Sequence, residues 1–343
     1  MKTLPLLIGL GACLGACIAP AMAVDRVKLK SGTQGTGTIT EISPTEVVVE
    51  LGATKRPHAV NDIESVTFDE EPNELTQARF AVAAGRYSDA TDLLAKIKAG
   101  QVKRPAVAED IEFYKAIAGA RAALAGNGSI ADAGRALVAF ERAHKNSYHY
   151  FEVCEVLGDL LSTANLPDRA EGFYTKLAAA PWPETKLRAA VLQGRALVGQ
   201  KKFEPAVAKF DEALAMSATG NQVDALKLAA TLGKADAQAG SGGTEQAIAA
   251  VEKIIAEANP EDQELHARAY NVLGNCYRAA GKKQEALLAF LHVDLLYSRF
   301  PLQHAEALAN LAALWAEVDK ADRAVQAQST LKEKYPQSAW AQK

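Results

Sequence analysis

Residues 157–177 read LGDLLSTANLPDRAEGFYTKL, and their spacing recurs at 193–213 (QGRALVGQKKFEPAVAKFDEA) and at 273–293 (LGNCYRAAGKKQEALLAFLHV). In each segment an alanine follows a glycine after 12 residues, and an aromatic residue follows that alanine after 4 more. The other apolar residues are spaced at three and four, which indicates helices with one buried face. A pattern that recurs in this way predicts a repeat array built from pairs of helices.

The glycine, alanine and aromatic positions resemble those of tetratricopeptide repeats (TPRs), whose fold is a stack of helix–turn–helix pairs. The spacing has a physical reason. Glycines such as Gly158, Gly194 and Gly274 let the second helix of the pair come close, and the later alanine lies where the two helices cross. The aromatic residue then fills the space that these small residues leave.

Weaker copies of the pattern extend the array in both directions. The residues that mark them are Gly85, Tyr87 and Ala90; Gly119, Ala136 and Phe140; Gly233, Ala247 and Val251; and Ala312, Trp315 and Ala324. The sequence therefore predicts about seven units over residues 73–343. This is a mainly α-helical fold of the α-solenoid class.

Residues 24–72 differ in pattern from the rest of the chain. Short β-branched runs are separated by turn residues every ~8–12 positions, which indicates about five strands in a small all-β barrel. The order of these runs, from Val27 to Phe68, resembles Sm-like and SH3-like barrels. Relatives of the Sm type often bind RNA. This segment carries five basic residues against nine acidic ones, so we expect a structural or protein-contact module instead.

Residues 1–23 read MKTLPLLIGLGACLGACIAPAMA and have the parts of a secretory signal peptide: a lysine, a short apolar run and an Ala-Met-Ala cleavage site. We therefore expect an exported protein, periplasmic or secreted, whose mature chain begins near Val24. The alternative is a bacterial lipobox, and two stretches resemble one, ending at Cys13 and at Cys17. In that case a lipid on Cys17 would anchor the protein to a membrane. No later apolar run is long enough for a transmembrane segment.

The remaining composition argues against catalysis and against nucleic acid as a partner. The chain has 343 residues and a formal net charge of −3, whereas binding a phosphate backbone needs a concentrated positive field. His144, His149 and Cys154 are spaced at five, not at the three or four that a metal site on one helix requires. Neither a nucleophile elbow nor a phosphate-binding loop is found. The sequence predicts no catalytic residue, no metal and no cofactor.

Two cysteines remain after the leader. Cys154 and Cys276 fall in separate repeats. An exported chain could join them in a disulfide. We expect instead two buried free thiols that act as small apolar side chains.

The first helix of each pair is expected to line the concave face of the array, where TPRs contact their ligands. The third unit places Glu152, Glu155 and Asp159 on this face. The later units place basic and amide side chains there, namely Arg188, Arg195, Lys227, Lys234, Arg268, Asn271, Asn275 and Arg278. The last four of these resemble the carboxylate clamp with which some TPR domains hold a peptide C-terminus. Asparagine amides can bind the peptide backbone, and arginine can pair with the carboxylate.

A simpler interpretation of the same residues is an intramolecular ladder. The acidic side chains of the third unit could pair with Arg188 and Arg195 across neighbouring helices, and such exposed pairs contribute only ~0.2–1 kcal/mol each. Residues 73–343 contain 32 basic and 32 acidic residues, so any positive surface in the array is local.

Together these patterns predict three segments, with boundaries at 1–23, 24–72 and 73–343. They favour a non-catalytic exported scaffold that binds a protein or peptide through the concave face of a TPR superhelix. The alternative is an envelope-assembly lipoprotein of TPR type, anchored through Cys17. The partner itself cannot be predicted from the sequence.

Overall fold

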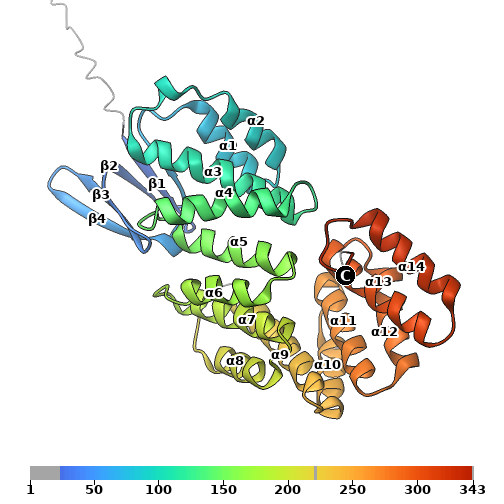
Figure 1. Cartoon of the computed structure of the whole chain (residues 1–343). Helices are drawn as coiled ribbons and strands as arrows, with labels where there is room; N and C mark the ends of the chain where they lie inside the picture. Colours follow the sequence, from blue (N-terminus) through green and yellow to red (C-terminus); the bar gives the residue numbers. More distant parts are fainter. Residues whose placement is uncertain (1–23, 220–221, 342–343) are drawn as a thin grey trace, which may run out of the picture.

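The computed structural model describes residues 24–219 and 222–341. Residues 1–23, for which the sequence predicts a signal peptide and which include Cys13 and Cys17, lie outside this range. Five strands come first, and 14 α-helices follow in the described part of the chain (Figure 1). The strands are β1 (Asp25–Leu29), β2 (Gln34–Ile42), β3 (Glu46–Leu51), β4 (Thr54–Ala59) and β5 (Ile63–Thr67). The helices are α1 (Asn73–Ala83), α2 (Tyr87–Ala95), α3 (Pro105–Leu124), α4 (Ile130–Ala143), α5 (Tyr150–Thr163), α6 (Pro167–Leu177), α7 (Pro183–Gly199), α8 (Phe203–Ala215), α9 (Val223–Gly240), α10 (Thr244–Glu257), α11 (Gln263–Ala279), α12 (Lys283–Leu296), α13 (Pro301–Glu317) and α14 (Ala321–Lys334).

The five strands form one antiparallel sheet in the order β4-β3-β2-β1-β5, so the last strand returns beside the first. Strand β2 alternates buried and exposed residues, as expected when one face is covered. Strand β4 begins at Thr54, whereas the sequence pattern indicates a fourth run only at Ala59 and Val60. Its residues TKRPHA are mostly exposed on a sheet edge, so they carry no apolar alternation from which a strand could be predicted.

The seven predicted helix pairs are all present, from α1–α2 to α13–α14. In six of them the fourth residue of the second helix is a buried alanine, and four residues later comes a large buried side chain. The alanines are Ala90, Ala133, Ala170, Ala206, Ala247 and Ala286, followed by Leu94, Leu137, Tyr174, Phe210, Val251 and Phe290. The predicted markers of the second unit are therefore wrong by about one helical turn. Ala136 is exposed, and nothing lies within 4 Å of a Cβ added at Gly119.

The repeat glycines lie directly under aromatic rings, as predicted. A Cβ added at Gly158 would come within 2.2 Å of the Tyr174 ring, and one at Gly194 within 2.6 Å of Phe210. Gly274 has the same relation to its own aromatic residue at 2.6 Å. The fifth pair has Val251 at the aromatic position, and its Gly233 is covered by Phe210 of the preceding pair instead, at 2.3 Å. Close helix packing is thus sterically fixed at these crossings.

The array curves, so that its last pair comes back towards the end of α5 (Figure 1). The segment after α14 contributes to this return, because Trp340 lines the same cavity as Leu124 of α3. The first helices of the later pairs thereby surround a concave interior. No helix in the described ranges is long and apolar enough to cross a membrane.

The sheet is joined to the array by a shared apolar core and by a buried carboxylate. Val27, Val66 and Phe68 of the β segment belong to the same cluster as side chains of α1 and α3. Asp25, 1% exposed, accepts hydrogen bonds from the backbone amides of Ile39 and Asp69 and from both terminal nitrogens of Arg104, at 2.5–2.8 Å. Burial raises the pKa of Asp25, but the bonds from Arg104 and the amides outweigh it and lower the pKa overall. The division at residue 72 stays a prediction.

A second buried carboxylate connects three helices. Asp110 of α3 is fully buried and accepts from Arg79 of α1 at 2.7 Å, from the Tyr148 hydroxyl at 2.9 Å and from the His149 ring at 3.2 Å. Arg79 also pairs with Glu71, which lies between the sheet and α1. These directional bonds fix the start of α5 against α1 and α3.

Cys154 and Cys276 are both buried and free, as expected. Burial raises the pKa of Cys154 to about 11 and that of Cys276 to about 12. Both thiols are therefore protonated near neutral pH, and we assign them to packing.

Candidate functional site

The concave interior holds a cavity of about 800 Å³, here called the concave cavity. It is lined by α5, α6, α7, α9 and α11, by the start of α13 and by the segment after α14. Three of the predicted basic residues come together in it, namely Arg188, Arg195 and Arg268. Glu155 and Asp159 of α5 lie on the same lining.

The intramolecular ladder is formed only in part. Arg188 pairs with Glu155 at 3.3 Å and also donates to the Gln222 amide oxygen. Asp159 accepts from the Tyr174 hydroxyl at 2.8 Å, and no ion pair joins it to Arg195 within the described residues. Burial is the main cause that raises the pKa values of both Glu155 and Asp159.

Arg195 stands apart from the other basic residues of the cavity. It is exposed, yet the cavity walls surround it, and it has neither a hydrogen bond nor an ion pair to any residue that the structure describes. Desolvation lowers the pKa of Arg195, and the positive charge of Arg268 lowers it further, while the negative charges of Asp159 and Glu306 oppose this shift without reversing it. Arg268 itself pairs with Glu264 on its own helix. An anionic group placed beside Arg195 would therefore relieve a repulsion and satisfy an unpaired guanidinium.

Two predicted lysines on α9 lie elsewhere. Lys234 pairs with Asp211 of α8 at 2.6 Å, so it points to the second helix of the preceding pair. Lys227 is half-buried and does not line the concave cavity. The actual cavity face of α9 carries Ala225, Leu226 and Ala229.

The residues that resemble a carboxylate clamp are engaged between helices. Asn271 donates to the Gln303 carbonyl at 2.9 Å, and Asn275 donates to Asp236 and Glu306, both at 3.3 Å. Arg278 donates to the Asn310 amide oxygen at 2.9 Å and pairs with Glu317 at 3.3 Å. This set therefore links α9, α11 and α13.

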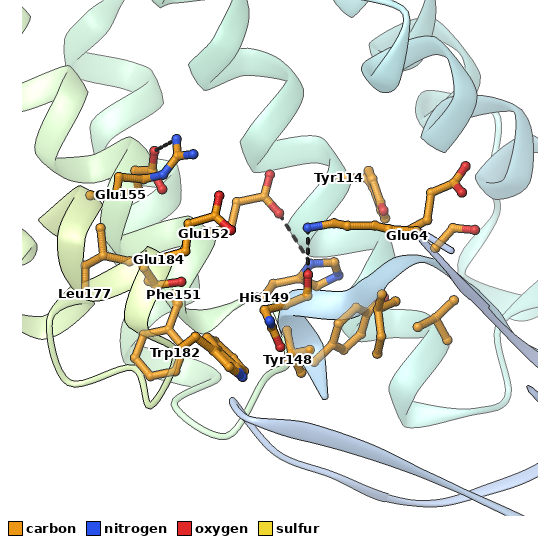
Figure 2. A pocket seen from close by; sticks show the side chains of 18 residues that line it. Glu64, Tyr114, Tyr148, His149, Phe151, Glu152, Glu155, Leu177, Trp182 and Glu184 are labelled. Atoms are coloured by element: carbon orange, nitrogen blue, oxygen red, sulfur yellow. Dashed lines mark hydrogen bonds and ion pairs between the residues drawn. The ribbon is translucent and has the colours of Figure 1, made fainter. Parts of the chain in front are cut away.

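A second cavity of about 380 Å³ lies between the sheet and the array, and we call it the junction pocket (Figure 2). One wall is formed by the start and middle of β5, residues 63–66, with Lys30 and Asn61 beside it. The other walls come from α3, α5 and the connection into α7. Glu155 and Arg188 line both cavities, so their ion pair stands between them.

The junction pocket combines aromatic and acidic side chains. Phe151 and Trp182 meet edge to face, with ring centroids 5.7 Å apart, and Figure 2 shows them together on one side of the pocket. Trp182 lies between Pro181 and Pro183, directly before α7. No sequence signal points to this pocket, because its walls come from six separate segments; the nearest hint is the Pro-Trp-Pro run at 181–183.

The chain resembles solved TPR-type structures. A tetratricopeptide repeat protein from Parabacteroides merdae aligns with a TM-score of 0.55 at 16% identity, covering 76% of this chain and 92% of that one. A Rap protein complexed with competence and sporulation factor gives 0.56 at 14% identity, over 78% and 76%. NprR in complex with its cognate peptide NprX gives 0.52 at 13% identity, over 76% and 77%.

The chain matches no protein-family model, and its sequence matches no curated protein. At these low identities the structural neighbours establish the fold alone. That fold is a TPR-type α-solenoid preceded by an antiparallel sheet of five strands.

Proposed function

We propose that this protein is a non-catalytic, exported scaffold that binds an extended segment of a protein or peptide in the concave cavity. The observation that carries the proposal is Arg195, an exposed guanidinium inside a walled cavity with no ionic partner in the described chain. Its ligand is expected to supply a carboxylate, either from an acidic side chain or from a C-terminus. Arg268 adds positive charge next to it.

The set of residues proposed to contact the ligand is therefore smaller than the set predicted from the sequence. Arg188, Arg195 and Arg268 are proposed to contact the ligand, because they line the cavity. The asparagines and Arg278 of α11, together with Lys227 and Lys234, are proposed to shape the array rather than to touch the ligand. That NprR has been solved in complex with its cognate peptide supports a peptide as the occupant of such a fold.

The proposal is tested by selecting peptides with free C-termini from a displayed random library and measuring their affinity by calorimetry. Arg195→Glu should weaken the selected peptides at least ten-fold, because it replaces an attraction by a repulsion. Arg26→Glu, an exposed arginine on β1, is the matched control and should leave affinity unchanged. Equal affinity for Arg195→Glu and the unaltered protein, with both folded, would overturn the proposal.

Export and anchoring form a separate part of the proposal. A signal peptide cleaved after Ala23 gives a mature chain that starts at Val24, whereas the lipoprotein alternative gives a chain that starts at a diacylglyceryl-modified Cys17. Mass spectrometry of the N-terminus of protein recovered from the native envelope distinguishes the two forms. We favour the start at Val24.

A further inference from the structure

Strand β5 is an edge strand whose open side faces the junction pocket. It pairs with β1 on one side and has no strand partner on the other among the described residues. Four consecutive β5 residues, Ile63 to Val66, line the pocket. Successive side chains of a strand point to opposite faces of the sheet, so a pocket on one face would be lined by alternate residues only. The pocket therefore lies along the edge, where unpaired backbone groups are presented.

The wall opposite this edge offers apolar surface. Tyr148, Phe151 and Trp182 line the pocket, and Figure 2 shows Phe151 and Trp182 on the side of the pocket away from Glu64. The start of α5 is fixed by the bonds of Tyr148 and His149 to Asp110. The space beside the strand edge is thus bounded by a rigid wall.

The charges around the pocket have an acidic surplus. Four glutamates line it, namely Glu64, Glu152, Glu155 and Glu184, against two basic residues, Lys30 and Arg188. Lys30 donates to the Asn61 carbonyl at 2.6 Å. Three of the glutamates are paired with basic residues of the chain: Glu64 with Lys28 at 2.6 Å, Glu152 with Arg121, and Glu155 with Arg188. Glu184 has neither a hydrogen bond nor an ion pair to any residue in the ranges 24–219 and 222–341.

We propose that the free edge of β5 binds an extended, cationic segment of another protein, which adds to the sheet beside β5. Main-chain hydrogen bonds to the edge provide affinity in this mode, and pockets for alternate side chains provide specificity. A lysine or arginine of the incoming strand pairs with Glu184, and an apolar neighbour packs on Trp182. This site is distinct from Arg195 of the concave cavity, so it does not depend on the function proposed above.

The test uses the full chain and a dansyl-labelled peptide of alternating valine and lysine with an amidated C-terminus. This probe has no carboxylate and therefore cannot use Arg195. We expect saturable binding by fluorescence anisotropy and slower hydrogen exchange of the β5 amides. Glu184→Lys should weaken binding at least five-fold. Glu204→Lys, an exposed glutamate on α8, is the matched control, and it and Arg195→Glu should leave binding unchanged.

A second peptide separates strand addition from simple charge attraction. It has the same sequence and charge, but its alternate backbone amides are N-methylated, which removes the donors along one edge. Strand addition predicts at least ten-fold weaker binding of this peptide. Equal binding of the methylated peptide, unchanged affinity in folded Glu184→Lys, or no saturable binding of the parent peptide would each overturn the proposal.

Discussion

The two ends of the molecule are held together by different kinds of contact. Where the sheet meets the first repeats, buried charges make directional bonds, as in Asp25 with Arg104 and Asp110 with Arg79. From the third repeat to the sixth, the crossings depend on shape, with a glycine under an aromatic ring. A sheet and a helix pair have no common surface pattern, so specific bonds fix their geometry. Similar helix pairs stack mainly by steric fit, supplemented by side-chain bonds such as those of Asn271 and Asn275 on α11.

The largest expected effect tests the charged junction. Asp110→Ala removes the acceptor shared by Arg79, Tyr148 and His149, and leaves buried donors without a partner. We expect a loss of about 3 kcal/mol in the free energy of unfolding, measured by urea denaturation. Burial raises the pKa of Asp110, but the bonds from His149 and Arg79 lower it overall. The difference from the unaltered protein should therefore shrink as the pH falls below 3.8, the unfolded value.

Asp132→Ala is the control for this variant. Asp132 pairs with Arg135 one turn away on α4, and both side chains are exposed. Its loss should change stability by less than about 0.5 kcal/mol. Similar losses in the two variants would mean that the buried cluster does not hold the junction.

The next prediction tests the repeats whose helices pack by shape. It compares substitutions of two glycines, each on the first helix of its pair. Gly194→Ala places a Cβ 2.6 Å from the Phe210 ring and should destabilise the protein by about 1–3 kcal/mol. Gly119→Ala meets nothing within 4 Å and should stabilise α3 by about 0.5–1 kcal/mol, because alanine has the higher helix propensity. Thermal or urea unfolding distinguishes them. The same sign for both variants would contradict the steric account.

A smaller effect concerns the amide network between α9 and α11. Burial raises the pKa of Asp236 to about 6, only partly offset by the hydrogen bond from Asn275. A carboxyl with a raised folded pKa binds a proton more tightly when folded, so stability falls as the pH rises from about 4 to 6. Asp236→Asn should therefore gain about 1–2 kcal/mol at pH 7.5, a figure reduced for the partial exposure of this side chain.

The pH series provides the control for Asp236→Asn. At pH 4 both proteins carry a neutral group at this position, and the gain should be nearly absent. Unfolding midpoints measured at both pH values test this. A gain of equal size at the two values would assign the effect to packing rather than to ionisation.

The smallest effect is expected for Lys234→Ala. The pair between Lys234 and Asp211 is half-exposed, and such pairs are worth at most about 0.5–1 kcal/mol. Unfolding should be almost unchanged, and so should the affinity of peptides selected for the concave cavity. A ten-fold loss of affinity would return Lys234 to the binding set and contradict its placement between α8 and α9.

The sequence predicted the order of the modules and the number of helix pairs, because apolar periodicity and small-residue spacing are local properties. It placed the markers of the second unit one helical turn too far along α4. The prediction used Ala136 and Phe140, whereas the residues at the repeat positions are Ala133 and Leu137. The sequence of α3 and α4 contains many alanines, and only packing decides which of them lies at the crossing. The start of strand β4 at Thr54 was not predicted for a related reason, since an exposed edge strand has no apolar pattern.

The candidate site was predicted less completely. Of the basic and amide residues assigned to the concave face, Arg188, Arg195 and Arg268 do meet in one cavity. Lys234 lies against α8, and the clamp-like asparagines bind neighbouring helices. Each residue turns the helix by about 100°, so a small change in the superhelical twist moves a side chain from the cavity to a helix interface.

By itself the amino-acid sequence determined the kind of structure: a β segment with its own alternation, then seven helix pairs whose glycines and aromatics fit together. The tertiary structure alone decided where binding could occur. The curvature of the array encloses the cavity in which Arg195 is unpaired. The packing of the sheet on the array places the β5 edge beside Glu184 and Trp182. Periodicity is a property of residues that are close in the sequence, whereas a cavity depends on the angle at which segments distant in the sequence meet.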